Sequence, residues 1–311
     1  MINKNIKIGI IGAGYMAEEY LKVLSKKKIW CEAIYSRTLS KCEKLRKKYK
    51  IKKISKSLNE FNANEEIKVI IITVNDISTF SLLKQLDLNR YKVLCEKPVG
   101  IDFKQTKKIL SLLKKNKKNF FVSLNRRFYG STMKAKNIVN KFKGKRLISI
   151  RDQQLQNTGS RILDKRVMYC NSVHLIDYIR IFARGRLKKI SKLKRFKNNK
   201  FSETITKLYF SSKDEVLYHC NWNSPGSWSV NIVQQNSRCE MKPLEELMEE
   251  KLSNGKRKRV NHKKLLIDSI FKPGLFLQID EFLKMLSNKK HNLITIKEYL
   301  ETVKLVKRIY V

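Results

Sequence analysis

Residues 8–17 read Ile-Gly-Ile-Ile-Gly-Ala-Gly-Tyr-Met-Ala, an apolar run that leads directly into a glycine-rich turn. The turn has the spacing Gly12-x-Gly14-x-x-Ala17 and stands between a predicted strand and a predicted helix over 16–25, the setting in which this motif holds a dinucleotide. Its glycines allow a tight turn and let the backbone approach a pyrophosphate, whose negative charge the helix N-terminus favours. The stretch therefore predicts a dinucleotide-binding site that includes Gly12, Gly14, Tyr15, Met16 and Ala17.

Strand and helix patterns alternate along the residues that follow the turn. Residues 69–74 are almost wholly apolar, as in a strand that is buried on both faces of a parallel sheet. Asp102 is placed to cap the N-terminus of a further helix. Other strand patterns occur at 30–35, 92–95 and 120–123, and a helix pattern occurs at 39–49. The alternation predicts an α/β fold in which residues 1–122 form a Rossmann domain, a doubly wound parallel sheet.

The rhythm changes after Asn125, which predicts a second domain over residues 123–311. Strand patterns between 187 and 233 are shorter and follow one another without long helices between them. Helix patterns lie at 131–141, 171–182, 276–286 and 296–309, and the clearest strand patterns lie at 204–210 and 216–222. We expect an α+β domain with an open, mainly antiparallel sheet.

The chain is strongly basic: its 69 Lys and Arg residues against 27 Asp and Glu residues give a net charge of +42. Nucleic-acid binding requires such cations, but here they occur in nearly every polar segment and have no interleaved aromatic residues. The compact run Lys256–Arg259 follows Gly255 and is predicted to lie in a loop. We therefore expect no dedicated nucleic-acid role, although the positive field would attract phosphorylated ligands.

Cysteine spacing and hydropathy restrict the environment of the protein. Six cysteines occur without any Cys-x-x-Cys pair, which argues against a zinc site, or any other metal site, and against a disulfide framework. No apolar stretch resembles a secretory signal or a span of about 20 residues. We expect reduced thiols, no membrane span and a cytoplasmic location.

The residues after the second strand pattern bear on the choice between NAD and NADP. NAD-binding proteins usually place Asp or Glu there, where it bonds the ribose 2′-hydroxyl. This chain reads Tyr35-Ser36-Arg37-Thr38, and the serine and arginine could donate hydrogen bonds to a 2′-phosphate. Arg37 could instead stack on the adenine. The pattern favours NADP, with NAD as the alternative, and adds Ser36, Arg37 and Thr38 to the cofactor-binding residues.

The segment Glu96-Lys97-Pro98 follows the strand pattern at 92–95. It would lie at the carboxyl end of that strand, where open α/β sheets bind their ligands. Pro98 disfavours helical geometry at Lys97 and so restricts the direction of its side chain. On its own, such a tripeptide could equally be an ordinary loop.

Several motifs along the chain together resemble one family of oxidoreductases. They are Gly12-x-Gly14-x-x-Ala17, Ser36-Arg37-Thr38, Glu96-Lys97-Pro98, Asn125-Arg126-Arg127-Phe128, Asp152-Gln153, Asn171-Ser172-Val173-His174-Leu175-Ile176-Asp177 and Lys272-Pro273-Gly274. This set resembles the glucose–fructose oxidoreductase/inositol dehydrogenase (Gfo/Idh/MocA) family. The resemblance implies a Rossmann domain and an open antiparallel sheet, whose outer face often mediates homo-oligomers.

The resemblance also implies an activity and a set of site residues. The activity is NAD(P)-dependent hydride transfer to or from a sugar, cyclitol or sugar derivative, including nucleotide-activated sugars as in surface-polysaccharide assembly. Lys97 would touch both cofactor and substrate, and His174 would be the acid–base residue. Thr73, Asn75 and Glu96 would contact the cofactor, while Arg127 and Asn171 would contact the substrate.

Two departures from the family pattern leave the activity open. Cys170 stands where many active members carry Asp, and positions 170, 174 and 177 would share one face of an α-helix. Asp177 could partly replace the missing carboxylate or serve local packing only. Val74 and Ser78 replace the usual Pro and His of the Thr-Pro-Asn-x-x-His segment. Since the family contains weakly active or regulatory members, the alternative function is a catalytically idle NADP(H)-binding sensor or partner protein.

Overall fold

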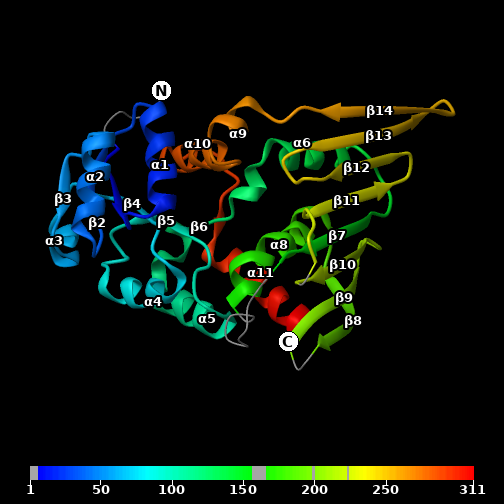
Figure 1. Cartoon of the computed structure of the whole chain (residues 1–311), viewed down its shortest axis with the longest axis horizontal. Coiled ribbons are helices and arrows are strands. Elements are labelled where there is room, and N and C mark those ends of the chain that lie inside the picture. Colours follow the sequence, from blue (N-terminus) through cyan, green and yellow to red (C-terminus); the bar gives the residue numbers. More distant parts are fainter. Residues whose placement is uncertain (1–5, 156–165, 198–199, 223) are drawn as a thin grey trace. The chain divides into compact units, whose positions relative to one another are not determined.

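The computed structural model describes residues 6–155, 166–197, 200–222 and 224–311 (Figure 1). The chain divides into two compact units, and each is formed by two separate stretches of sequence. Unit 1 comprises Met1–Asn125 and Gly274–Glu301, and unit 2 comprises Arg126–Pro273 and Thr302–Val311.

The sheet of unit 1 has the strand order β15-β6-β5-β4-β1-β2-β3. Its strands are parallel except for β15, which pairs antiparallel with β6. The strand order runs outward in both directions from the neighbours β1 and β4, as in a doubly wound sheet, so the predicted Rossmann fold is confirmed. The strands are β1 (Ile8–Ile11), β2 (Cys31–Tyr35), β3 (Lys53–Ser55), β4 (Val69–Ile72), β5 (Lys92–Glu96), β6 (Phe120–Ser123) and β15 (Ile294–Thr295).

Helices connect the strands of this sheet. Three of them begin at a side-chain cap, because Ser57, Asn75 and Asp102 each accept a hydrogen bond from a backbone N–H in the first turn. The helices of unit 1 are α1 (Tyr15–Lys26), α2 (Leu39–Tyr49), α3 (Leu58–Ala63), α4 (Asp76–Gln85), α5 (Phe103–Leu112) and α10 (Leu275–Leu286).

The stretch Gly274–Glu301 lies in unit 1, whereas the predicted domain boundaries place it in the second domain. Its helix α10 packs on α1, where Lys27 Nζ lies 2.5 Å from Asp280 Oδ1 and 3.3 Å from the centre of the Phe276 ring. Further along, β15 extends the sheet by pairing with β6. The sequence pattern shows that residues 276–286 have an apolar face, but it does not show which sheet or helix covers that face. The predicted and observed domain assignments of this stretch differ for that reason.

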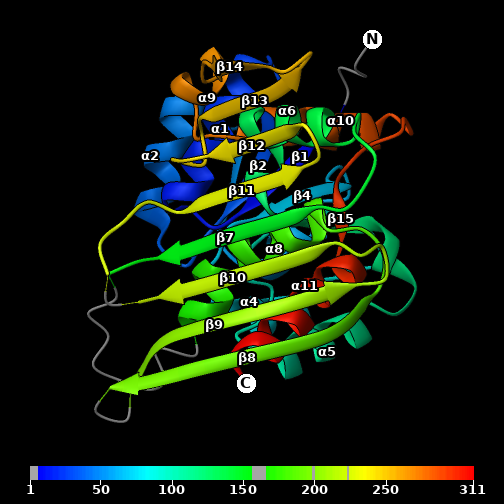
Figure 2. The same ribbon diagram turned by 90° about the vertical axis from the view of Figure 1, so that its right-hand side faces the viewer.

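The sheet of unit 2 has eight strands in the order β14-β13-β12-β11-β7-β10-β9-β8, which Figure 2 shows side by side. Among the described residues, β7 and β10 form its one parallel pair, so the predicted mainly antiparallel sheet is confirmed. The strands are β7 (Leu147–Gln153), β8 (Leu187–Lys197), β9 (Lys200–Phe210), β10 (Glu215–Asn221), β11 (Ser229–Gln234), β12 (Ser237–Met241), β13 (Leu247–Ser253) and β14 (Lys256–His262).

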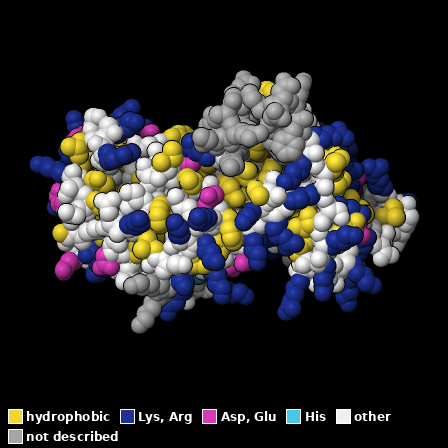
Figure 3. Space-filling model, turned by 90° about the horizontal axis from the view of Figure 1, so that it is seen from below, with side chains coloured by type: hydrophobic (Ala, Val, Ile, Leu, Met, Phe, Trp, Pro, Cys, Tyr) yellow, Lys and Arg dark blue, Asp and Glu magenta, His cyan; other side chains and the backbone are white. Residues whose placement is uncertain are grey.

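The basic run Lys256–Arg259 lies in the edge strand β14, so its prediction as a loop was wrong. The four side chains are exposed, and therefore the strand shows no apolar alternation in the sequence. Charged side chains on an edge strand discourage pairing with another chain. In Figure 3 Lys and Arg side chains are scattered over the face in view.

Helices cover one face of this sheet. Alternate residues of β7 and β10 are buried, including Ile148, Ile150 and Tyr218, and α8 packs on β7 while α6 packs on β12 and β13. The helical segments are α6 (Gly130–Val139), a π-helical turn (Met168–Ser172), α8 (Val173–Phe182), α9 (Leu266–Ile270) and the last residues of α11 (Ile296–Tyr310). Among the described residues, no helix combines the length and the apolar composition needed to cross a membrane.

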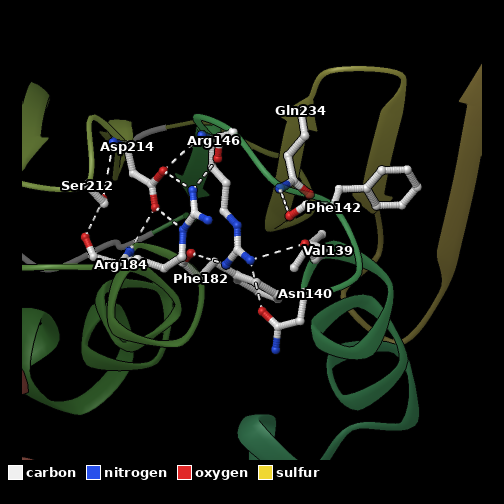
Figure 4. Close-up of polar contacts among 10 residues, drawn as sticks. Val139, Asn140, Phe142, Arg146, Phe182, Arg184, Ser212, Asp214 and Gln234 are labelled. Carbon is white, nitrogen blue, oxygen red and sulfur yellow. Dashed lines mark hydrogen bonds and ion pairs between the residues drawn. The ribbon is translucent and has the colours of Figure 1, made fainter.

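A buried polar cluster joins the ends of α6 and α8 to the sheet (Figure 4). The Arg146 guanidinium is buried and donates hydrogen bonds to Val139 O (3.1 Å) and Phe182 O (2.8 Å), two carbonyls at helix C-termini. Asp214 is fully buried and accepts hydrogen bonds from the Arg184 guanidinium and from the backbone N–H groups of Arg146 and Arg184. Burial alone would raise the pKa of Asp214, but these hydrogen bonds outweigh it and lower that pKa.

We expect Asp214→Asn to lower the free energy of unfolding by about 3 kcal/mol at pH 7, because an amide keeps one acceptor oxygen and leaves the Arg184 charge unbalanced. The carboxylate stabilises the fold above the unfolded pKa of about 3.9, and this contribution is lost as the pH falls through the lowered folded pKa. Urea unfolding followed by circular dichroism measures both effects. Glu43→Gln, in an exposed pair with Arg46, is the control and should cost less than about 1 kcal/mol. An equally small loss for Asp214→Asn would contradict this role of the cluster.

Candidate active site

The predicted cofactor residues of unit 1 gather at one edge of its sheet. Gly12 follows β1, Ser36 follows β2, Thr73 follows β4 and Lys97 follows β5, so all four lie at carboxyl ends of neighbouring parallel strands. The Gly12 N–H donates a hydrogen bond to Tyr35 O (2.8 Å), and the Thr73 N–H donates one to Ile11 O (2.8 Å). The strand order reverses between β1 and β4, the point at which open α/β sheets bind ligands.

The two glycines of the turn have different surroundings. A Cβ on Gly12 would lie 2.5 Å from Thr73 Oγ1, and its φ of +109° disfavours any other residue, so glycine is required for the chain to fold here. Gly14 is extended and exposed, and a Cβ built on it meets no described heavy atom within 4 Å apart from its chain neighbours. The space in front of Gly14 therefore leaves room for a ligand.

The N-terminus of α1 fits the pyrophosphate of a dinucleotide. Its N-cap residue is Gly14, which has no side chain to cap the helix, whereas the N-cap side chains of α3, α4 and α5 accept hydrogen bonds. Open backbone N–H groups and the helix dipole together favour a phosphate group there. Tyr15 is exposed, Met16 is half-buried and Ala17 is buried against the core, so the first two are the ones that can face a ligand.

The segment after β2 carries donors and no carboxylate. Ser36 is half-buried, and its Oγ accepts a long hydrogen bond from the Thr38 N–H (3.4 Å). Arg37 is exposed and forms no ion pair or hydrogen bond with the described part of the chain. Its guanidinium can therefore turn to an anionic ligand without breaking a hydrogen bond or ion pair with any described residue.

Thr73 and Asn75 begin the connection from β4 to α4. Thr73 Oγ1 donates a hydrogen bond to Ile11 O (3.2 Å), which ties the end of β4 to the end of β1. Asn75 is exposed and its Oδ1 caps α4 by accepting from the Ser78 N–H (2.9 Å). The same side chain still carries its Nδ2 donor at this edge of the sheet.

Glu96 is held by the interior of unit 1. Its Oε1 accepts hydrogen bonds from Tyr20 OH (2.6 Å) and Ser123 Oγ (2.7 Å). Burial, together with the nearby Glu96 carboxylate, raises the pKa of Tyr20 well above its ordinary value. The two contacts fix the end of β5 immediately before Lys97, which is half-buried at the carboxyl edge.

In unit 2, His174 lies in the first turn of α8 and is 3% exposed. The predicted helix over 171–182 begins earlier than expected, as a π-helical turn that contains Cys170 and Asn171, both half-buried. Such turns occur frequently at functional sites. The predicted shared face of Cys170, His174 and Asp177 therefore begins in a π-helical turn and continues into α8, rather than lying on one regular α-helix.

Arg127, a predicted substrate contact, forms an ion pair with Asp177. Its Nε and Nη2 donate to the two oxygens of that carboxylate at 2.5 and 2.7 Å, and Thr302 Oγ1 donates a further hydrogen bond at 3.0 Å. Asp177 is buried and its charge is balanced by Arg127. This geometry therefore favours a local packing role for Asp177. It argues against Asp177 replacing the carboxylate that many active family members carry at the position of Cys170.

A buried hydrogen-bond network around Asp152 supports the π-turn, and its contacts were not predicted from the sequence. Asp152 is fully buried and accepts hydrogen bonds from Tyr218 OH (2.6 Å) and Gln154 Nε2 (2.8 Å), and burial raises its pKa. Gln154 also reaches Ser172 Oγ (3.2 Å) and Asn171 Nδ2 (3.5 Å). The signal that could have found this network is the alternation of β7, which places the polar Asp152 on the inward face.

Beside this network, unit 2 contains a cavity of about 380 Å³. It lies where β7 ends and where the β10–β11 and β12–β13 connections meet it. The Arg126 guanidinium lies 4.3 Å from the centre of the Trp228 ring. The walls of the cavity include Arg126, Gln153, Gln154, Trp228, Leu244 and Glu245.

Solved structures with the same fold are found at low sequence identity. The dehydrogenase MviM from Clostridium difficile is 20% identical with a TM-score of 0.81, and the match covers 98% of this chain and 99% of that one. Levoglucosan dehydrogenase in complex with NADH and levoglucosan is 12% identical with a TM-score of 0.81, and the match covers 98% of this chain and 95% of that one. A super-repressor mutant of Gal80p from Saccharomyces cerevisiae is 13% identical with a TM-score of 0.83, and the match covers 98% of this chain and 95% of that one.

Comparison of sequences agrees with the fold. No curated protein sequence matches the chain. Residues 6–124 match the family model described as "Oxidoreductase family, NAD-binding Rossmann fold" (GFO_IDH_MocA). The predicted resemblance to the Gfo/Idh/MocA family is thereby confirmed over residues 6–124, the NAD-binding Rossmann domain.

Proposed function

We propose that this protein is an NADP(H)-preferring oxidoreductase that transfers a hydride between the nicotinamide and a sugar, cyclitol or sugar derivative, including a nucleotide-activated sugar of surface-polysaccharide assembly. The observation that carries the proposal is the carboxyl edge of the unit 1 sheet. There the N-terminus of α1, with the exposed Gly14 as its N-cap residue, and Lys97 follow neighbouring strands. We further propose a cytoplasmic homo-oligomer.

The chemistry that we propose assigns separate tasks to two side chains. When bound, the nicotinamide supplies or accepts the hydride. The Lys97 ammonium donates a hydrogen bond to the substrate oxygen and stabilises the negative charge that develops on it. The His174 imidazole takes up or returns the proton of that oxygen, which an imidazole can do near neutral pH.

Other residues hold the ligands or these two side chains in position. The backbone of the glycine turn would bind the pyrophosphate. The ribose end of the cofactor would be bound by Ser36, Arg37 and Thr38. The nicotinamide end would be bound by Thr73, Asn75 and Glu96. Asn171 would contact the substrate. Arg127 would act through its ion pair with Asp177, which fixes α8 one turn after His174. The sugar class is supported by the family match of residues 6–124 and by the likeness to levoglucosan dehydrogenase, whose structure holds NADH and levoglucosan.

Arg37→Ala should weaken NADPH binding about tenfold and leave NADH binding within about twofold, because a hydrogen bond to a charged group contributes about 1.5–3 kcal/mol and only NADPH carries the 2′-phosphate. Dissociation constants from nicotinamide fluorescence measure both. Lys47→Ala, which removes an exposed cation from the other end of α2, is the control. Equal losses for the two cofactors would assign Arg37 to adenine stacking, and a lower NADH constant in the wild type would contradict the preference.

A second candidate is a catalytically idle NADP(H)-binding sensor or partner protein. Cys170 in place of a carboxylate favours it, and so does the likeness to a Gal80p super-repressor. Incubation of the purified protein with NADP⁺ or NADPH and a panel of sugars, cyclitols and nucleotide sugars separates the two. Absorbance change at the nicotinamide band with any member supports the oxidoreductase, whereas cofactor binding without turnover on the whole panel supports the sensor.

A further inference from the structure

We propose that the cavity of unit 2 binds a second, uncharged sugar ring, so that the substrate is a glycoside or disaccharide whose other ring reacts. The inference rests on the proposed function for the identity of the reacting ring. Binding to the cavity itself requires no hydride transfer. A cavity of about 380 Å³ lies within the size range of small-molecule sites.

The charge of the cavity differs from that of the whole chain. Lys and Arg make up 69 of 311 residues, and the net charge is +42. Among the described residues that line the cavity, however, Arg126 is the one cation and Glu245 balances it. A carboxylate in the wall repels phosphate, so the cavity disfavours a phosphorylated or nucleotide-activated group although the surrounding surface attracts one.

The polar groups of the cavity match vicinal hydroxyls, which donate and accept hydrogen bonds at the same time. Arg126 can only donate, Glu245 as a carboxylate can only accept, and Gln153 can do both. Gln154 lies in the same wall, but its Nε2 already donates to Asp152 and Ser172. The Arg126 guanidinium lies over the Trp228 ring and, as a fork of several N–H donors, can bond more than one acceptor. A ring that carries several hydroxyls can satisfy this mixed set, whereas a purely apolar ligand would leave it unpaired.

Apolar surface in the cavity suits the C–H faces of a sugar ring. Trp228 is half-buried, and Leu155 and Leu244 lie in the same wall. The combination of flat apolar surface with a few convergent polar groups is typical of small-molecule sites.

The cavity is separate from the proposed reacting groups but connected to them. Neither His174 nor Cys170 is among its lining residues. Gln154 lines the cavity and also lies 3.5 Å, Oε1 to Nδ2, from Asn171, the proposed substrate contact. We therefore place the second ring in the cavity and the reacting ring on the Asn171 side of Gln154.

Isothermal titration of the full chain without cofactor tests the proposal. The probes are glucose, UDP-glucose and the disaccharides maltose, cellobiose, lactose and sucrose. We expect at least one disaccharide to bind about tenfold tighter than glucose and tighter than UDP-glucose. Trp228→Ala and Glu245→Gln should each weaken that disaccharide about tenfold and change glucose binding less than about twofold, as expected for losing one stacked or charge-assisted contact.

Glu246→Gln is the matched control, because Glu246 is the exposed neighbour of Glu245 and does not line the cavity. It should leave all affinities unchanged. Three results would each overturn the second-ring site. Glucose could bind as tightly as every disaccharide, or UDP-glucose could bind more tightly than all other probes. The third such result is an unchanged disaccharide affinity in both cavity variants. Since no turnover is measured, these results are independent of whether the protein transfers a hydride, and loss of activity on the sugar panel would overturn the proposed function alone.

Discussion

Lys97→Ala is expected to lower kcat/KM at least about 100-fold for any sugar that the wild-type protein turns over. Lys97 follows β5 at the carboxyl edge of the sheet, and the preceding Glu96 is fixed by Tyr20 and Ser123. Removal of the ammonium takes away a donor that is already positioned for charge developing on the substrate oxygen. The loss should therefore appear mainly in kcat, as the disappearance of an interaction made in the transition state.

Initial rates of NADPH oxidation measure this effect, and two further variants interpret it. Lys104→Ala removes an exposed cation from α5 and should leave kcat/KM unchanged, so it controls for the loss of positive charge. Lys97→Arg keeps the charge in a different shape and should retain part of the activity. Near-normal turnover of Lys97→Ala would show that Lys97 takes no part in the chemistry. An equal loss of kcat/KM in Lys104→Ala would show that Lys97 acts only through general electrostatic attraction.

The architecture of unit 1 could be predicted because its signals are local. The turn at Gly12 needs glycine for both its φ and its contact with Thr73, and the fully buried β4 must be apolar along its whole length. Asp102 caps α5 through a hydrogen bond to a residue three positions later. Each of these requirements concerns residues whose spacing is visible in the sequence.

Elements decided by distant contacts could not be placed in this way. The position of α10 depends on α1, about 250 residues earlier, through Lys27 and Asp280. Strand β14 is an exposed edge strand whose cations carry no strand periodicity. In both cases the deciding partner is a part of the chain that the local pattern does not identify.

The candidate site shows the same division. The glycine turn, Ser36-Arg37 and Lys97 follow strand ends, so topology alone brings them to one edge. By contrast, the pairing of Arg127 with Asp177 joins residues 50 positions apart in sequence and requires the fold to be known. The cavity around Trp228 likewise forms where the end of β7 meets the β10–β11 and β12–β13 connections, which come together only in the folded sheet.

Gly14→Val separates cofactor binding from folding. The backbone at Gly14 is extended, a conformation open to valine, and the new side chain meets no described heavy atom at its Cβ. We expect the free energy of unfolding to fall by no more than about 1 kcal/mol, the scale of an N-cap change. The branched side chain would nevertheless occupy the approach of a pyrophosphate to α1. Loss of two backbone hydrogen bonds to a charged group corresponds to at least about 100-fold in affinity.

The most direct test of whether this turn holds the cofactor is a titration of the wild-type protein and of Gly14→Val with NADPH. Nicotinamide fluorescence reports binding, and thermal unfolding is measured in parallel on both proteins. We expect saturable binding to the wild type, binding at least about 100-fold weaker to the variant, and nearly equal unfolding temperatures. Equal affinity in the two proteins, or no binding to the wild type, would contradict the assignment of the dinucleotide to the turn at Gly12 and Gly14.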